Sequence, residues 1–148
     1  MIENLALATA MVGLTVIIHF TGLLLLMHML RMRGHHFRVH ESTIGQGVLI
    51  VMVVLGIFAI HTAEIWAYAF VFQAIGAIDG FEQALYFSTV NFTTLGYGDI
   101  VLSEQWRLFA AIEGANGLIL IGWSTAFLLA VTTRMRTLEH DWLDKDQS

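Results

Sequence analysis

The chain has 148 residues, of which 57% are hydrophobic and 13% are charged, and its formal net charge is −5. Soluble domains have an apolar share nearer ~45–50%, so this composition favours a protein whose helices are surrounded by lipid. The chain contains no cysteine, which excludes disulfides, thiolate catalysis and cysteine-ligated metal sites.

Three apolar stretches are each long enough to cross a bilayer. The first covers about residues 5–30 without a charged side chain, the second about 44–78 with only Glu64, and the third about 106–133 with Glu113 in its interior. Because a helix of ~20 residues spans the hydrocarbon core, each stretch predicts a transmembrane helix. The first stretch is too long, and its N-terminal flank too acidic, for a cleaved signal peptide.

The basic residues are distributed unevenly around these stretches. All but Arg107 lie between the first two stretches or after the third: Arg31, Arg33, Arg38, Arg134, Arg136 and Lys145. The positive-inside rule therefore predicts a cytoplasmic first loop and C-terminus, with the N-terminus and the segment before the third stretch outside. Residues 31–38 are predicted to contact anionic lipid headgroups.

Histidines gather in the first loop. The segment 31–41 contains three of them: His35, His36 and His40. Nothing in the sequence makes these imidazoles converge, so lipid contact or a pH-dependent cytoplasmic gate is favoured over metal binding. His19 and His28 in the first stretch are predicted to be packing or interfacial residues.

A shorter apolar segment, 81–92, lies between the second and third stretches. It is too short to cross a bilayer and too apolar for an exposed loop, which predicts a re-entrant helix. The preceding Asp79, three residues before a Glu, predicts the helix cap. Residues 93–98 then predict an extended strand, in which Gly96 and Gly98 permit positive φ, so that consecutive carbonyls point to one side.

The sequence T-T-L-G-Y-G-D at 93–99 resembles the selectivity filter of the potassium-channel pore-loop family. Over roughly residues 44–133 the chain is similar to a bacterial tetrameric K⁺ channel subunit, with one extra N-terminal transmembrane helix. The resemblance implies an all-α membrane protein with three transmembrane helices, a re-entrant pore helix and a filter, assembled as a fourfold homotetramer in the bacterial inner (plasma) membrane. Residues 1–43 are then the extra helix and its loop, 44–133 the pore module and 134–148 a short cytoplasmic tail.

The filter residues of that family carry over to this chain by position. In the family, backbone oxygens from four strands replace the hydration shell of K⁺. The resemblance therefore implies that K⁺ binds the carbonyls of Thr94, Leu95, Gly96 and Tyr97 and the Thr94 hydroxyl, with Gly98 completing the ion-binding strand. K⁺ is the only cofactor implied, with no organic cofactor and no nucleic-acid partner. No nucleophile–base pair or metal-binding triad is evident in the sequence, so an enzyme is not expected.

Residues around the filter are predicted to support it. They are Thr93, Asp99, Tyr86, Asn91, Glu113 and Glu64. Tyr86 and Phe87 occupy positions where many members of the family have a hydrogen-bonding Trp, and only Tyr86 can donate a hydrogen bond.

The two carboxylates within the predicted spans need polar partners, because an ionised carboxylate is costly in lipid. Glu113 is predicted to bond pore-helix donors such as Asn91 or Thr89. Glu64, one turn after His61, is predicted to meet the extracellular mouth or the pore helix. Structural hydrogen bonding and a pH- or ion-sensitive filter gate both remain open for these carboxylates.

The third stretch contains candidate cavity residues. Gly117 falls where the family often places a bend-permitting glycine, with Gly114 and Gly122 as rivals; alternatively these glycines permit close helix packing. If Gly117 marks the bend, Ile121 and Thr125 face the cavity at helical spacing from it.

The predicted function is passive K⁺ conduction, without an attached voltage-sensor or ligand-binding domain. The first stretch lacks the regular Arg or Lys series of a voltage sensor. Two alternatives stay open: a weakly selective cation channel, and a non-conducting accessory or sensor subunit of a membrane complex. The sequence leaves the gating stimulus open, as well as the choice between a gate at the filter and one near residues 126–133.

Overall fold

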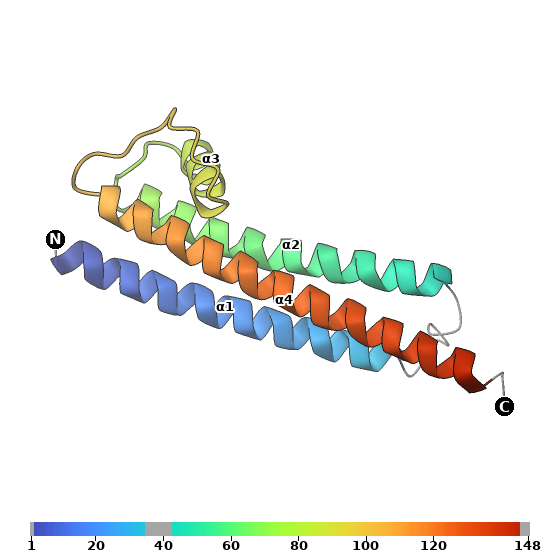
Figure 1. Cartoon of the computed structure of the whole chain (residues 1–148). Coiled ribbons are helices and arrows are strands. Elements are labelled where there is room, and N and C mark those ends of the chain that lie inside the picture. Colours follow the sequence, from blue (N-terminus) through green and yellow to red (C-terminus); the bar gives the residue numbers. More distant parts are fainter. Residues whose placement is uncertain (1, 35–42, 146–148) are drawn as a thin grey trace.

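The computed structural model describes the backbone of residues 2–34 and 43–145, and side chains within 2–32 and 44–134. The described ranges contain four helices and no strand. The helices are α1 (Ile2–Gly34), α2 (Thr43–Ala74), α3 (Phe81–Phe92) and α4 (Arg107–Lys145). The long helices α1, α2 and α4 lie side by side, and the short α3 packs against α2 and α4 at one end of this bundle (Figure 1).

The three long helices confirm the three predicted membrane spans. Residues 2–32, 44–74 and 107–134 are each long and apolar enough to cross a membrane. The chain is therefore an all-α membrane protein. The segment 134–148, predicted as a tail, continues the helix as far as Lys145.

The second helix ends earlier than its apolar stretch predicts. α2 stops at Ala74, and the chain then turns at Gly76, whose φ is 67°. A positive φ costs glycine little because it has no Cβ. The apolar residues beyond this turn pack into the core, and Ile78 is among the buried side chains.

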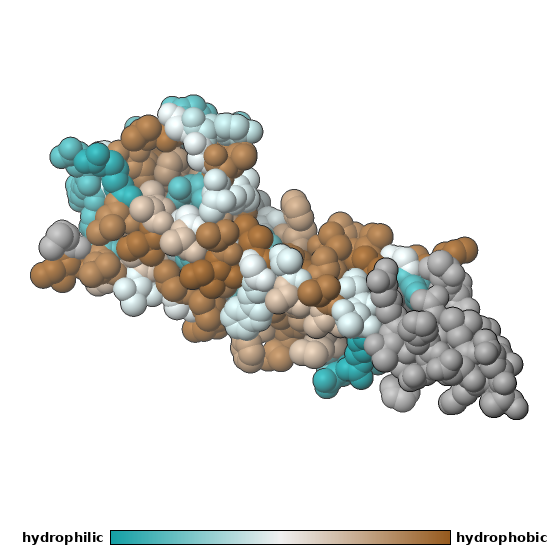
Figure 2. Space-filling view, viewed as in Figure 1, coloured by the Kyte–Doolittle hydropathy of each residue, from teal (hydrophilic) through white to brown (hydrophobic). Residues whose placement is uncertain are grey.

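The face of the bundle seen in Figure 2 is largely apolar. Ile17 of α1, Phe58 of α2 and Leu129 of α4 are 64%, 72% and 65% exposed. Exposure of this much apolar surface to water is unfavourable for a free monomer. Lipid tails or other subunits would cover the same surface at little cost in free energy.

An aromatic core joins α3 to the long helices. Tyr68 and Phe72 of α2, Phe92 of α3 and Phe109 of α4 are fully buried. The Phe72 and Phe109 rings lie 5.1 Å apart, and the Tyr68 and Phe109 rings 5.9 Å apart. Such ring pairs stabilise a core beyond the area that they bury. This core holds α3 in a fixed position at the end of the bundle.

The predicted cap of α3 is wrong. The residue at the cap position is Gly80, with φ 87° and ψ 134°, and no side chain makes a cap hydrogen bond there. Asp79 lies one residue too early, because the positive φ of Gly80 shifts the start of the helix along the chain. The Gly80 carbonyl accepts the first helical bond, from the Ala84 N–H at 3.1 Å.

The N-terminal helix is joined to the rest of the bundle by polar side chains as well as by packing. Asn116 of α4 donates to the Thr15 hydroxyl of α1 at 2.8 Å and to the Tyr68 hydroxyl of α2 at 3.2 Å. Near the N-terminus, the Asn4 amide donates to the Gln105 carbonyl. α1 therefore belongs to the same packed unit as the other helices.

α4 and the end of α3 approach each other very closely at Gly117. A Cβ on Gly117 would lie 2.1 Å from the carbonyl oxygen of Phe92. A backbone oxygen cannot move aside as a side chain can, so we expect Gly117→Ala to separate the two helices. The cost is about 1–3 kcal/mol of stability, as for other overpacked sites. Thermal unfolding of the purified protein in detergent measures it.

Gly13→Ala is the matched control for this substitution, because a Cβ on Gly13 meets nothing within 4 Å. Alanine is the better helix former, so this variant should unfold at or above the wild-type temperature. Equal unfolding temperatures for Gly117→Ala and the wild type would contradict the close contact.

Candidate functional site

The segment T-T-L-G-Y-G-D follows directly from the C-terminal end of α3. All seven residues, 93–99, are exposed in the single chain and none is helical or in a strand. Its first four N–H groups donate to carbonyls of α3. The Thr93 N–H donates to Thr89 at 3.2 Å and the Thr94 N–H to Asn91 at 2.9 Å, whereas those of Leu95 and Gly96 both donate to Val90, at 3.0 and 3.2 Å. The helix therefore fixes the beginning of the segment.

The backbone of this segment alternates between residues with positive φ and residues without it. Thr94, Gly96 and Gly98 have φ of 60°, 55° and 75°, whereas the intervening Leu95 and Tyr97 do not have positive φ. In an extended strand successive carbonyls point to opposite sides; residues of alternating hand turn the peptide planes so that the carbonyls gather on one side. The positive φ expected at the two glycines is confirmed, and the expected strand is replaced by this alternating conformation.

Thr94 is the unexpected member of the alternation. It is the only residue other than glycine with positive φ in the described ranges. A β-branched residue rarely adopts this conformation, at a cost of about 1–2 kcal/mol. Strain of this kind persists where the surrounding structure holds it and is concentrated at functional sites.

The outer end of the segment is attached to α3 by one side-chain hydrogen bond. The Tyr86 hydroxyl donates to Asp99 Oδ2 at 2.8 Å. This bond raises the pKa of Tyr86 above its ordinary value of 10.0 because it stabilises the protonated phenol. The neighbouring Phe87 instead packs edge-on against Phe72, with ring centroids 5.2 Å apart. Tyr86 alone of this aromatic pair therefore supports the segment.

Behind the segment, a buried carboxylate joins α3 to α4. Glu113 is fully buried; its Oε1 accepts from the Ser88 hydroxyl at 2.5 Å and its Oε2 from the Asn91 amide at 2.6 Å. Asn91 also donates to the Ala110 carbonyl at 2.7 Å. The predicted contact with Asn91 is confirmed. Thr89 does not take part, because it faces outward and donates to the Leu85 carbonyl of its own helix.

Glu64 lies elsewhere than predicted. It is fully buried and therefore not at an extracellular mouth. Its two oxygens face His19 Nδ1 of α1 at 2.9 Å and His61 Nδ1 of α2 at 2.7 Å, not donors of α3. The prediction missed His19 as a partner because the two residues are 45 positions apart in the sequence.

The predicted cavity stripe differs from the observed packing. Gly117 is buried against Phe92, and Ile121 packs against the core of the chain. Only Thr125 of the three is exposed, with its hydroxyl donating to the Ile121 carbonyl at 2.8 Å. Close helix packing therefore accounts for Gly117. The exposed face of α4 runs through neighbouring positions instead: Leu118, Ile119 and Gly122.

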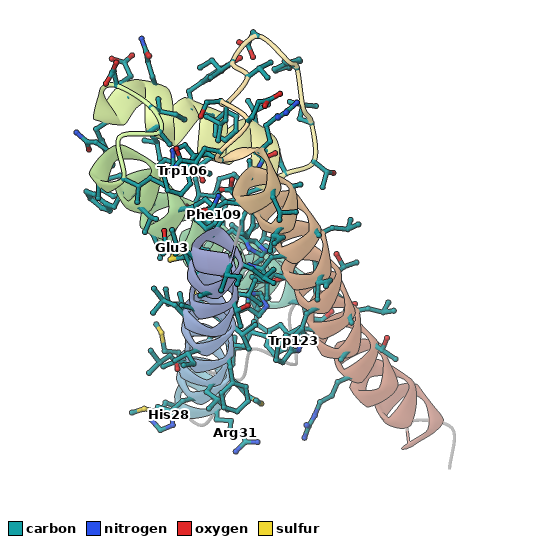
Figure 3. All side chains as sticks on the ribbon, turned by 90° about the vertical axis from the view of Figure 1, so that its left-hand side faces the viewer. Glu3, His28, Arg31, Trp106, Phe109 and Trp123 are labelled. Carbon is teal, nitrogen blue, oxygen red and sulfur yellow. The ribbon has the colours of Figure 1, made fainter. Side chains whose placement is uncertain are left out.

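The candidate segment and the first basic loop lie at opposite ends of the bundle. Figure 3 shows Trp106 and Phe109 at the end where α3 packs, and His28 and Arg31 at the other end. Of the predicted lipid-contact segment 31–38, only residues up to 34 are described. The three loop histidines lie outside the described residues.

Comparison with known protein families identifies the family of the chain. A family model described as ion channel matches residues 48–134, more than half of the chain. The chain therefore belongs to this family, the pore-loop channels of the two-helix potassium-channel type. The matched region contains most of α2, all of α3, the segment 93–99 and the membrane-spanning part of α4, and it leaves out α1. No curated protein and no solved structure matches the chain.

Glu113→Gln tests whether the buried carboxylate fixes α3. The new amide oxygen can accept from Asn91, and the NH₂ group then faces the Ser88 hydroxyl. That hydroxyl must accept instead of donating to residue 113, and its remaining acceptor is the Ile65 carbonyl at 3.0 Å. Hydrogen bonds to a carboxylate are worth about 1 kcal/mol more than neutral ones, so we expect thermal unfolding in detergent to shift to lower temperature.

Glu104→Gln is the control, because Glu104 forms only an exposed pair with Arg107, at 2.8 Å. Exposed pairs contribute little to stability, so this variant should unfold as the wild type does. If both glutamines lowered the unfolding temperature equally, the special role of Glu113 would be refuted.

Proposed function

We propose that the chain is one subunit of a potassium-selective channel that conducts K⁺ passively. The K⁺ ligands are the carbonyls of Thr94, Leu95, Gly96 and Tyr97 and the hydroxyl of Thr94. The observation that carries the proposal is the alternating backbone at 94–98 within the sequence T-T-L-G-Y-G-D. Rows of carbonyl oxygens replace the hydration shell of K⁺ in channels of this kind.

The active unit is a homotetramer. The segment 93–99 is exposed along its whole length, and Tyr97 is 67% exposed. One chain encloses no ion, since its carbonyls line one side only. Four copies around an axis surround a K⁺ ion with carbonyls from every side, and they cover side chains such as Tyr97. Closed rotational symmetry is also the usual arrangement of identical subunits.

The short helix adds an electrostatic contribution. The segment 93–99 begins at the C-terminal end of α3, where the helix dipole is negative. In a tetramer, four such ends face the inner end of the filter and favour a cation there. Asp99, held by Tyr86, adds negative charge at the other end of the segment.

The channel lies in the inner membrane of a bacterium, with the N-terminus outside and the C-terminus in the cytoplasm. Arg31 lies at the end of the bundle opposite α3 (Figure 3). Under the positive-inside rule that end is cytoplasmic, which places the outer end of the filter on the extracellular side.

Flux measurements on the purified chain in liposomes test this proposal. With K⁺ inside and an impermeant cation outside, we expect K⁺ efflux that Ba²⁺ blocks, and much smaller efflux when Na⁺ replaces K⁺. The mass of the detergent-solubilised particle should correspond to four chains.

Two results would overturn the proposal in different ways. Equal K⁺ and Na⁺ efflux would indicate a weakly selective cation channel. A tetramer that conducts neither ion would indicate a non-conducting accessory or sensor subunit.

Gly96→Ala tests the role of the backbone conformation. Within one chain a Cβ on Gly96 meets nothing within 4 Å, so there the φ of 55° is what opposes the substitution. Alanine is strained there by about 1–2 kcal/mol, and relaxation to negative φ turns a carbonyl away from its neighbours. We expect the liposome assay to show loss of K⁺ preference over Na⁺.

Gly47→Ala in α2 is the control, since a Cβ there also meets nothing within 4 Å and its φ is not positive. Selectivity should be unchanged in this variant. Wild-type selectivity in Gly96→Ala would show that the left-handed backbone is not required.

A further inference from the structure

Three polar side chains converge within the membrane-spanning part of the bundle, and none of them belongs to the segment 93–99. They are His19 of α1 and His61 and Glu64 of α2, which we call the His–Glu cluster. His19 and Glu64 are fully buried, and the His61 side chain is 15% exposed. The Nδ1 atoms of the two imidazoles lie 2.9 and 2.7 Å from the two oxygens of Glu64.

The surroundings of the cluster are aromatic and apolar. The two imidazole rings lie 5.4 Å apart, the Trp123 ring lies 5.2 Å from His19, and the Phe92 ring lies 5.8 Å from His61. Among the described side chains, Ser124 of α4 adds a polar contact, because its hydroxyl lies 3.5 Å from His19 Nε2. A carboxylate in such surroundings is costly unless a positive charge compensates it.

Hydrogen bonds within the cluster leave one nitrogen unsatisfied. Two imidazoles that donate Nδ1–H satisfy both oxygens of Glu64. However, His61 Nε2 is buried and has no hydrogen-bond partner. An ion bound by both imidazoles and by Glu64 would replace the Nδ1–H bonds between them, and the lone pair of His61 Nε2 is a further nitrogen that no protein group engages. The cluster therefore has coordinating capacity that its protein neighbours do not use.

The donor set matches one class of ion. The three residues each offer a ligand atom, and these atoms lie within 4.8 Å of one another. Two imidazole nitrogens and one carboxylate oxygen suit zinc and similar divalent transition metals, whereas Mg²⁺ and Ca²⁺ prefer oxygen ligands alone. We propose that His19, His61 and Glu64 bind one divalent transition-metal ion of the zinc class.

Such an ion compensates the charge of Glu64 and fastens α1 to α2. α1 lies outside the region that matches the channel family, so the site joins the additional helix to the pore module. Its position also reaches α3, because His61 packs against Phe92, whose carbonyl contacts Gly117. Bound metal should therefore stabilise the packing behind the filter.

Metal titration of the full chain tests this site. The protein is purified through a tag without histidine, stripped with a chelator and titrated in detergent with Co²⁺ and then Zn²⁺. We expect one tightly bound ion per chain, a visible absorption typical of four-coordinate Co²⁺, and a rise in unfolding temperature with Zn²⁺. His61→Gln and Glu64→Gln should each lose this ion and the temperature rise.

Two controls separate the cluster from other histidines. His28 is an exposed histidine on the same helix, α1, and His28→Gln should retain the bound ion. A variant in which the three loop histidines are all replaced by Gln should retain it as well. Ser124→Ala, which removes the hydroxyl near His19 Nε2, should weaken binding about 10-fold, as loss of an outer partner does.

The outcomes are decisive in either direction. A wild-type chain that binds no stoichiometric ion, or a His61→Gln variant that binds as much as the wild type, overturns the proposal, and the cluster is then a hydrogen-bonded clamp. If the substitutions prevent folding, the Co²⁺ spectrum of the wild type decides, since the absence of a four-coordinate signal refutes the site. None of these results depends on whether the chain conducts K⁺.

Discussion

The contact between α3 and α4 is the constraint on which the site depends. The lack of a side chain at Gly117 lets the Phe92 carbonyl approach α4 closely, and Glu113 holds α3 through Ser88 and Asn91. Phe92 is the last residue of α3, directly before the segment 93–99. Displacement of α3 would therefore displace the proposed ion ligands, so a packing contact and a buried carboxylate together set the geometry of the backbone that follows.

The sequence was sufficient to predict the parts of the fold that depend on local composition. Long stretches with few or no charged residues predicted the three spans, and the short apolar segment predicted α3, because bilayer thickness sets helix length. Contacts between distant residues were harder to predict. Asn91 was foreseen as a partner of Glu113, but Ser88 was not, and His19 was missed as a partner of Glu64. Hydropathy does not determine the rotation of one helix against another, and that rotation selects these partners.

The backbone conformation of the segment 93–99 could likewise be predicted only in part from the sequence. Glycine at 96 and 98 predicted positive φ because glycine alone adopts it freely. Thr94 also has a positive φ, although β-branched residues disfavour that conformation. It is held there by its place at the end of α3, where its N–H and that of the next residue bond carbonyls of the helix. Tertiary constraint overrides local propensity at the one position where the proposed ligands include a side chain as well as a carbonyl.

The N–H groups that bond carbonyls of α3 have a consequence for the ions that the proposed filter can accept. Those of Thr94, Leu95 and Gly96 are already engaged by the Asn91 and Val90 carbonyls. An anion needs donors, and this stretch has no main-chain donor left to offer; what remains available is oxygen, which carries negative partial charge. A chloride ion at these residues would lose hydration water without gaining main-chain N–H donors in its place. In the proposed filter, these backbone hydrogen bonds therefore also disfavour anions at residues 94–96.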